Sequence, residues 1–260
     1  MASRYSERLA KLNTKTSENW WPFSFGYPLA RRFVAITGDW SWITPNNTTV
    51  VSTFALMLGS FLLMLRDGRA DWIALGLLQM HVVLDCADGT LARYRGESTA
   101  LGAFLDKAGD QAGFLMLGGA AGYRAFYEDG IGSGEPWIVV VGAVGAGCYV
   151  AVCYIYWVAA FFELEAATKK EDRTAVPGKE EHESEAAGLG KRVSEYFLGQ
   201  WRVLHFNAPD FPMWVPVLII LGHPDYVVLA IAITQGLTLI KKIIQRARAM
   251  DALDKASGAS

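Results

Sequence analysis

The sequence has few cysteines and little net charge, and these two features exclude several classes of site and of protein. Its 260 residues include three cysteines, none in a Cys-x2-Cys pair, so neither a zinc site nor a disulfide framework is expected. The formal net charge of -2 argues against a general nucleic-acid-binding protein. The opening segment MASRYSERLAKLN contains no apolar core, so we expect no secretory signal peptide there.

Apolar residues, in contrast, make up 52% of the chain and gather in long runs between charged stretches. A membrane-spanning helix needs roughly 20 mostly apolar residues. We therefore predict an all-α integral membrane protein with six transmembrane helices, at residues 47–65, 71–94, 99–127, 137–162, 208–222 and 225–244. The fifth segment is short and contains two prolines, which leaves its start undefined.

The distribution of lysine and arginine predicts the orientation of these helices. With both termini in the cytoplasm, twenty of the 24 basic residues fall in cytoplasmic segments and three in the opposite loops, and Lys107 lies inside the third helix. Positive residues accumulate on the cytoplasmic side. The predicted parts are a cytoplasmic N-terminal segment (1–46), a membrane domain (47–248) with a polar cytoplasmic loop (164–200), and a cytoplasmic tail (249–260).

The segment 17–37 mixes aromatic residues with Arg31 and Arg32. This composition predicts an amphipathic helix that lies on the cytoplasmic membrane surface, and an ordinary surface loop is the alternative.

Four aspartates lie inside the predicted membrane helices, where an ionised side chain is costly and usually marks a functional site. They belong to two stripes of residues, one on the second helix and one on the third, because their spacings of three and four place them on a single helix face. The two stripes are Asp85, Asp88, Gly89, Ala92 and Arg93, and Gly102, Asp106 and Asp110.

The connection between the two stripes predicts how they meet. Gly96 and then Ser98 or Thr99 suit a helix stop and an N-cap, so the helices are expected to be antiparallel neighbours. Counted from this turn, Asp88 and Asp106 should share one layer, roughly 13 Å along the helix axis. Asp85 and Asp110 should share a deeper layer, and the four carboxylates would surround one small volume.

Four carboxylates in one volume repel one another unless cations neutralise them. Ligands that are all oxygen suit Mg²⁺ or Mn²⁺ better than Zn²⁺. Gly89 and Ala92 leave room for a bulky ligand, and Arg93 can pair with a phosphate, so the stripes predict a metal–pyrophosphate site. The alternative is a structural contact in which the aspartates pair with Arg93, Arg95 and Lys107, but four aspartates exceed what such a contact needs.

The pattern Asp-x2-Asp-Gly-x2-Ala-Arg-x8-Gly-x3-Asp-x3-Asp resembles the signature of the CDP-alcohol phosphotransferase (CDP-alcohol phosphatidyltransferase) family at every fixed position. The segment 43–49 resembles the opening of that family's first span, with Thr44 and Pro45 as N-cap and first helical residue. The resemblance implies a homodimeric membrane enzyme that transfers a substituted phosphate group from a CDP-linked donor to an alcohol and releases CMP.

The resemblance also implies a role for each residue of the signature. One or two divalent metals would be held on the donor pyrophosphate by Asp85, Asp88, Asp106 and, as a shared ligand, Asp110. The nucleotide would be bound by Gly89, Ala92, Arg93 and Gly102. Asp110 would be the general base that takes the proton of the acceptor hydroxyl. His81, one turn from Asp85, is either an acceptor-side residue or a histidine that packs between helices.

The signature concerns only the CDP part of the donor, so the substrate pair stays open. We expect phospholipid synthesis in a prokaryotic cell membrane, with CDP-diacylglycerol or a CDP-linked head group as donor. One alternative is a CDP-inositol-type enzyme that joins two soluble polyols. Another is a divalent-cation transporter whose ion path is formed by the aspartate layers.

Overall fold

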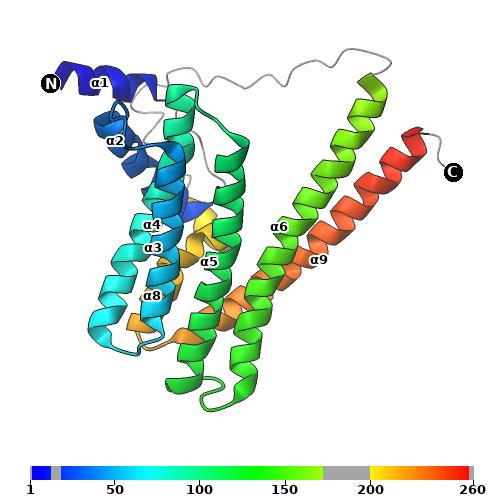
Figure 1. Ribbon diagram of the computed structural model, residues 1–260. Coiled ribbons are helices and arrows are strands. Elements are labelled where there is room, and N and C mark those ends of the chain that lie inside the picture. The colour runs from blue at the N-terminus through cyan, green and yellow to red at the C-terminus, as the bar shows by residue number, and fades with distance from the viewer. Residues whose placement is uncertain (1, 13–18, 172–199, 258–260) are drawn as a thin grey trace.

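The structure is a computed structural model that describes residues 2–12, 19–171 and 200–257, and every regular element in this part of the chain is a helix. Three long helices stand together in Figure 1: α3 (Pro45–Leu63), α4 (Gly68–Arg95) and α5 (Ala100–Tyr127). Two more, α6 (Pro136–Glu171) and α9 (Pro224–Ser257), pack on one another and on α5. The all-α prediction is confirmed.

The number of six membrane spans is not confirmed. Four helices in the described residues are long and apolar enough to cross a membrane, namely α3, α4, the first part of α6 and most of α9. Helix α5 has 28 residues, but its charged residues and glycines lower its mean hydropathy. The predicted fifth span at 208–222 is a short 3₁₀ turn, η3 (Ala208–Asp210), followed by the 10-residue helix α8 (Phe211–Ile220).

Two helices continue beyond the predicted apolar segments, while the predicted domain boundaries stay predictions. Helix α6 runs to Glu171, so the first residues of the predicted loop 164–200 are helical, and residues 172–199 lie outside the described part. Helix α9 runs to Ser257, through most of the predicted tail 249–260. The α6 extension contains alanine, glutamate and lysine, and the α9 extension contains alanine, leucine and methionine. These residues have high helix propensity, so each helix continues once its apolar run ends.

The segment 17–37 was predicted to be helical, and the structure is helical from residue 20 onward, while residues 17 and 18 lie outside the described part. The N-terminal region also contains one helix that was not predicted. A π-helical turn, η1 (Pro22–Gly26), leads into α2 (Tyr27–Thr37), and the additional helix is α1 (Ala2–Lys11). Arg8 of α1 donates to the carbonyl of Ala35 at 3.2 Å, and Arg31 of α2 donates to the carbonyl of Leu9 at 2.7 Å. These bonds join α1 and α2 into one unit at the end of the bundle.

The two ends of the chain lie at the same end of the bundle as the turn between α4 and α5 (Figure 1). This arrangement agrees with the prediction that both termini are on one side of the membrane. Which side faces the cytoplasm stays a prediction from the lysine and arginine distribution.

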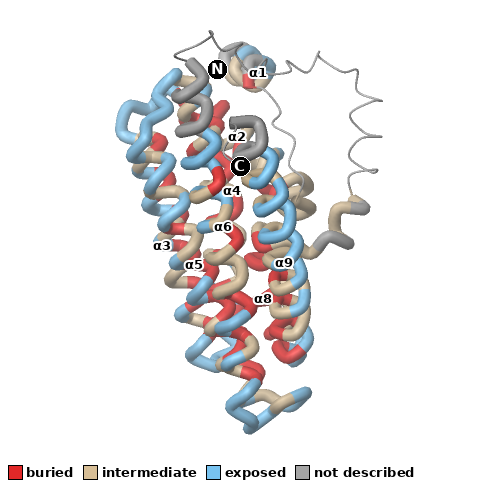
Figure 2. The backbone as a smooth tube through the Cα atoms, turned by 90° about the vertical axis from the view of Figure 1, so that its right-hand side faces the viewer, coloured by how far each residue is buried: buried red, intermediate tan, exposed pale blue. Residues whose placement is uncertain are grey.

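Helices α6 and α9 carry many exposed apolar side chains. Exposed stretches of the backbone are pale blue in Figure 2. A soluble protein rarely exposes so many large apolar side chains together, whereas hydrocarbon chains accommodate them. The set includes Val140, Val144, Tyr154, Phe161, Ile233, Leu237 and Ile240. The surface of the bundle therefore fits a lipid environment.

Glycines on α5 let neighbouring helices approach closely. A Cβ atom at Gly109 would overlap the side chain of Thr53 on α3, and one at Gly113 would overlap Leu56. Gly118 meets α6 in the same way, where its Cβ would lie 2.6 Å from that of Ala146. Small residues at such contacts are typical of helix packing in membranes.

Replacing Gly109 with alanine should therefore destabilise the bundle by about 1–3 kcal/mol, since α3 would have to move away from α5. Thermal unfolding of the purified protein in detergent measures this effect. The matched control is Gly119→Ala, because nothing lies within 4 Å of a Cβ at Gly119 on the same helix. Equal melting temperatures for the two variants would contradict the packing argument.

Candidate functional site

The turn between α4 and α5 has the geometry that its sequence predicts. Gly96 ends α4 in the left-handed region, with φ of 68°, and the N–H of Glu97 donates to the carbonyl of Ala92 at 2.9 Å. Thr99 caps α5, because its hydroxyl oxygen accepts from the N–H of Gly102 at 3.0 Å. The turn reverses the chain, so the two aspartate stripes run antiparallel.

Helix α3 was not expected to have a part in the site, yet it packs against both stripe-bearing helices. Direct packing between α4 and α5 is slight by comparison. Thr44 caps α3, accepting from the N–H of Asn47 at 3.2 Å, and Pro45 is its first residue, as the sequence predicted. The first turns of α3 therefore lie against the space between the two stripes.

Three of the four predicted aspartates come together in that space. One carboxylate oxygen from each of Asp85, Asp88 and Asp106 lies within 4.8 Å of the other two. Asp110, one turn further along α5, does not belong to this group. The structure thus brings both α4 carboxylates to Asp106. Asp110 also acts electrostatically on Asp85, so the expected pairing of Asp85 with Asp110 stays a prediction.

Neighbouring side chains hold this cluster in place. The hydroxyl of Thr49 on α3 donates to Asp88 at 2.5 Å, and the N–H of Gly89 donates to the other oxygen of Asp88. The ammonium of Lys107 lies 2.8 Å from Asp106, so it is the partner of a neighbouring carboxylate. One cation among these acids leaves negative charge that a metal ion can neutralise.

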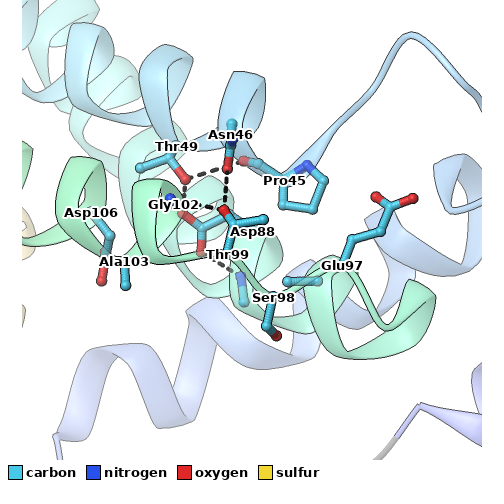
Figure 3. A pocket seen from close by; sticks show the side chains of 12 residues that line it. Pro45, Asn46, Thr49, Asp88, Glu97, Ser98, Thr99, Gly102, Ala103 and Asp106 are labelled. Carbon is cyan, nitrogen blue, oxygen red and sulfur yellow. Dashed lines mark hydrogen bonds between the residues drawn. The ribbon is translucent and has the colours of Figure 1, made fainter.

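A pocket of about 170 Å³ opens beside the cluster, between the start of α3, the end of α4 and the start of α5 (Figure 3). Its lining residues are Pro45, Asn46, Thr49, Asp88, Gly89, Ala92, Glu97, Ser98, Thr99, Gly102, Ala103 and Asp106. Gly102 is required for its shape, since a Cβ there would lie 2.8 Å from the side-chain oxygen of Asn46. Five residues of the signature thus line one pocket.

Four predicted residues lie outside the pocket lining, namely Asp85, Asp110, Arg93 and His81. The exposed Arg93 lies over Gly89, with its Nη1 atom 3.3 Å from where a Cβ would be. His81 is 3% exposed, its Nδ1 lies 2.9 Å from the hydroxyl oxygen of Ser52, and its ring meets Phe114 edge-on. These are packing contacts, so a role for His81 on the acceptor side stays a prediction.

Asn46 and Thr49 are pocket residues that the sequence reasoning did not single out. The sequence did contain an indication of both, because they follow the predicted cap of α3 by less than two turns. The contact of Thr49 with Asp88, 39 residues away, depends on how α3 packs on α4.

Replacing Thr49 with valine should weaken Mn²⁺ binding by about 10–100-fold, because Asp88 would lose the hydroxyl that orients it. Titration of the purified protein with Mn²⁺, followed by electron paramagnetic resonance, measures this affinity. Thr48→Val is the matched control, since the equally buried Thr48 hydroxyl donates to the carbonyl of Thr44 within its own helix. Equal Mn²⁺ affinities would contradict a supporting role for Thr49.

The donors available in the cluster fit a hard divalent cation. All three are carboxylate oxygens, and no histidine or cysteine belongs to the group in the described residues. Mg²⁺ and Mn²⁺ prefer such oxygen ligands, and Mg²⁺ is commonly bound by one or two carboxylates together with phosphate oxygens. The pocket beside the cluster has room for the phosphate-bearing part of a ligand.

These features define an all-α membrane protein with a carboxylate site that can hold a divalent cation. The profile of the CDP-alcohol phosphatidyltransferase family matches residues 42–171, which is half of the chain. The chain belongs to this family, whose members are transferases of phosphate-containing groups.

One curated relative is the phosphatidylinositol phosphate synthase of Corynebacterium glutamicum. It is 36% identical over 86 residues, a stretch that covers 33% of this chain and 38% of that relative.

Proposed function

We propose that the protein transfers a phosphatidyl group from CDP-diacylglycerol to the hydroxyl of a polar alcohol in phospholipid biosynthesis, with release of CMP. The observation that carries this proposal is the meeting of Asp85, Asp88 and Asp106 beside a pocket lined by small residues. Family membership supports a CDP-linked donor, and the name of the relative supports a phospholipid product.

The cluster would hold one or two Mg²⁺ or Mn²⁺ ions, which would neutralise the donor pyrophosphate and the CMP that leaves. Gly89, Ala92 and Gly102 line the pocket without long side chains, so the nucleotide can approach the helix backbones there. Arg93 would contact a phosphate from the exposed side of α4.

Asp110 is proposed as the general base. Its carboxylate lies one turn beyond Asp106 on α5, outside the three-carboxylate group, and would accept a proton there. The proton of the acceptor hydroxyl passes to Asp110 as the hydroxyl oxygen bonds to the phosphorus distal to cytidine. The bond from that phosphorus to the bridging oxygen then breaks, and CMP leaves.

The name of the relative makes a phosphorylated inositol the first acceptor to test. We further propose a homodimer whose termini and site face the cytoplasm of a prokaryotic cell, as the lysine and arginine distribution and the family resemblance suggest.

The test is CMP release by the purified protein with Mg²⁺ or Mn²⁺. Donors would be CDP-diacylglycerol, CDP-ethanolamine, CDP-choline and CDP-inositol, each against a panel of alcohols that includes inositol phosphate. We expect metal-dependent CMP release from CDP-diacylglycerol and a product that partitions into organic solvent. A water-soluble product from CDP-inositol would support the polyol-joining alternative. No CMP release from any pair, together with metal-ion flux in vesicles, would support the transporter alternative.

A further inference from the structure

The start of α2 touches α4 beside the carboxylate cluster. A Cβ at Gly26 would lie 2.8 Å from the sulfur of Cys86 and 3.0 Å from Cγ1 of Val82. Cys86 follows Asp85 directly in the sequence. The unit formed by α1 and α2 therefore contacts α4 at the level of Asp85. Tyr27 directly follows Gly26, the residue that makes this contact.

The ring of Tyr27 packs against the buried cluster that contains Ala30, Cys86 and Leu91. Its hydroxyl lies in the field of the site, since Asp85, Asp88 and Arg93 all act on it electrostatically. Burial, together with the neighbouring Cys86 and Asp85, raises the pKa of Tyr27 to about 12. The hydroxyl is therefore protonated and can donate, and no described residue accepts a hydrogen bond from it.

The helix geometry places Tyr27 and Arg93 together. Cys86 and Arg93 are seven residues apart, close to two full turns, so they share one face of α4. Gly89 lies between them, and the Arg93 guanidinium covers it. Gly89 lines the pocket, and Arg93 acts electrostatically on Tyr27, so this face of α4 connects Tyr27 with the site.

We propose that Tyr27 is a donor-binding residue whose hydroxyl donates a hydrogen bond to a phosphate oxygen of the CDP-linked donor, next to Arg93. The inference rests on the proposed function. Helix α2 would then take part in substrate binding in addition to membrane attachment. Any movement of α2 on the membrane surface would move the Tyr27 hydroxyl relative to the bound phosphate.

The experiment measures binding of CDP with Mg²⁺ to the purified protein by calorimetry, together with KM and kcat for CDP-diacylglycerol. Tyr27→Phe keeps the ring and removes the hydroxyl, and we expect roughly tenfold to a hundredfold weaker CDP binding, as for a hydrogen bond to a charged group. The loss should appear in KM more than in kcat. Tyr5→Phe is the control, since Tyr5 packs against the same apolar cluster from α1.

A difluorotyrosine at position 27 retains a hydroxyl and should restore CDP affinity, which a purely structural role would not predict. Wild-type affinity in Tyr27→Phe, with Mg²⁺-dependent CDP binding intact, would overturn this inference and leave the proposed function standing. Equal losses in Tyr27→Phe and Tyr5→Phe would also overturn it. A wild-type protein that binds no CDP would overturn the proposed function as well.

Discussion

Replacing Asp110 with asparagine should lower kcat by roughly 10²–10⁴-fold, the usual contribution of a general base. Asparagine has the shape of aspartate but cannot take the proton of the acceptor hydroxyl. Because Asp110 is not part of the three-carboxylate group, binding of CDP with Mg²⁺ should be largely retained. The measurement is CMP release under saturating substrates, with calorimetric CDP binding on the same preparation.

Asp88→Asn is the matched comparison for Asp110→Asn. Asp88 belongs to the group and lines the pocket, so its replacement should lose both metal-dependent CDP binding and CMP release. The two variants thus separate binding from proton transfer. If Asp110→Asn kept wild-type kcat, or lost CDP binding as fully as Asp88→Asn, the assignment of separate roles would be wrong.

Replacing Arg124 with methionine should destabilise the protein by about 3–5 kcal/mol, because Asp71 would be left buried without its partner. Arg124 donates two hydrogen bonds to Asp71, at 2.6 and 3.0 Å, and both residues are 5% exposed. It also donates to the carbonyl of Leu63 at 3.0 Å and pairs with Glu128. One side chain thereby joins α3, α4 and α5 at the end of the bundle away from the site.

Thermal unfolding in detergent measures this effect, and Arg69→Met is the control. Arg69 is exposed near the start of α4, so its replacement should change stability by no more than about 0.5 kcal/mol. The double variant Asp71→Leu/Arg124→Met should recover much of the loss, since apolar pairs can replace a buried ion pair. A single Arg124→Met variant as stable as wild type would contradict the account of this contact.

The features that could be predicted from the sequence depend on residues within one or two helical turns of one another. The stripe Asp85, Asp88 and Gly89 follows from helical period, and the turn follows from a glycine stop at Gly96 and a cap at Thr99. These rules are local, and the structure agrees with them at each position.

Features that depend on how helices pack were missed. Thr49 reaches Asp88 across 39 residues, and Arg124 reaches Asp71 across 53. The layer argument left out α3, because it assumed that α4 and α5 pack directly. Helix α3 packs against both helices and contributes residues to the pocket beside the carboxylates.

The central claim is that Asp85, Asp88 and Asp106 bind a divalent metal together with the phosphates of a CDP-linked donor. The most direct measurement is electron–nuclear double resonance of Mn²⁺ bound to the purified protein in the presence of CDP. The account predicts a ³¹P hyperfine coupling from phosphate oxygens on the metal, present in wild type and lost in Asp88→Asn. Bound Mn²⁺ with no ³¹P coupling in wild type, or an unchanged coupling in Asp88→Asn, would contradict it.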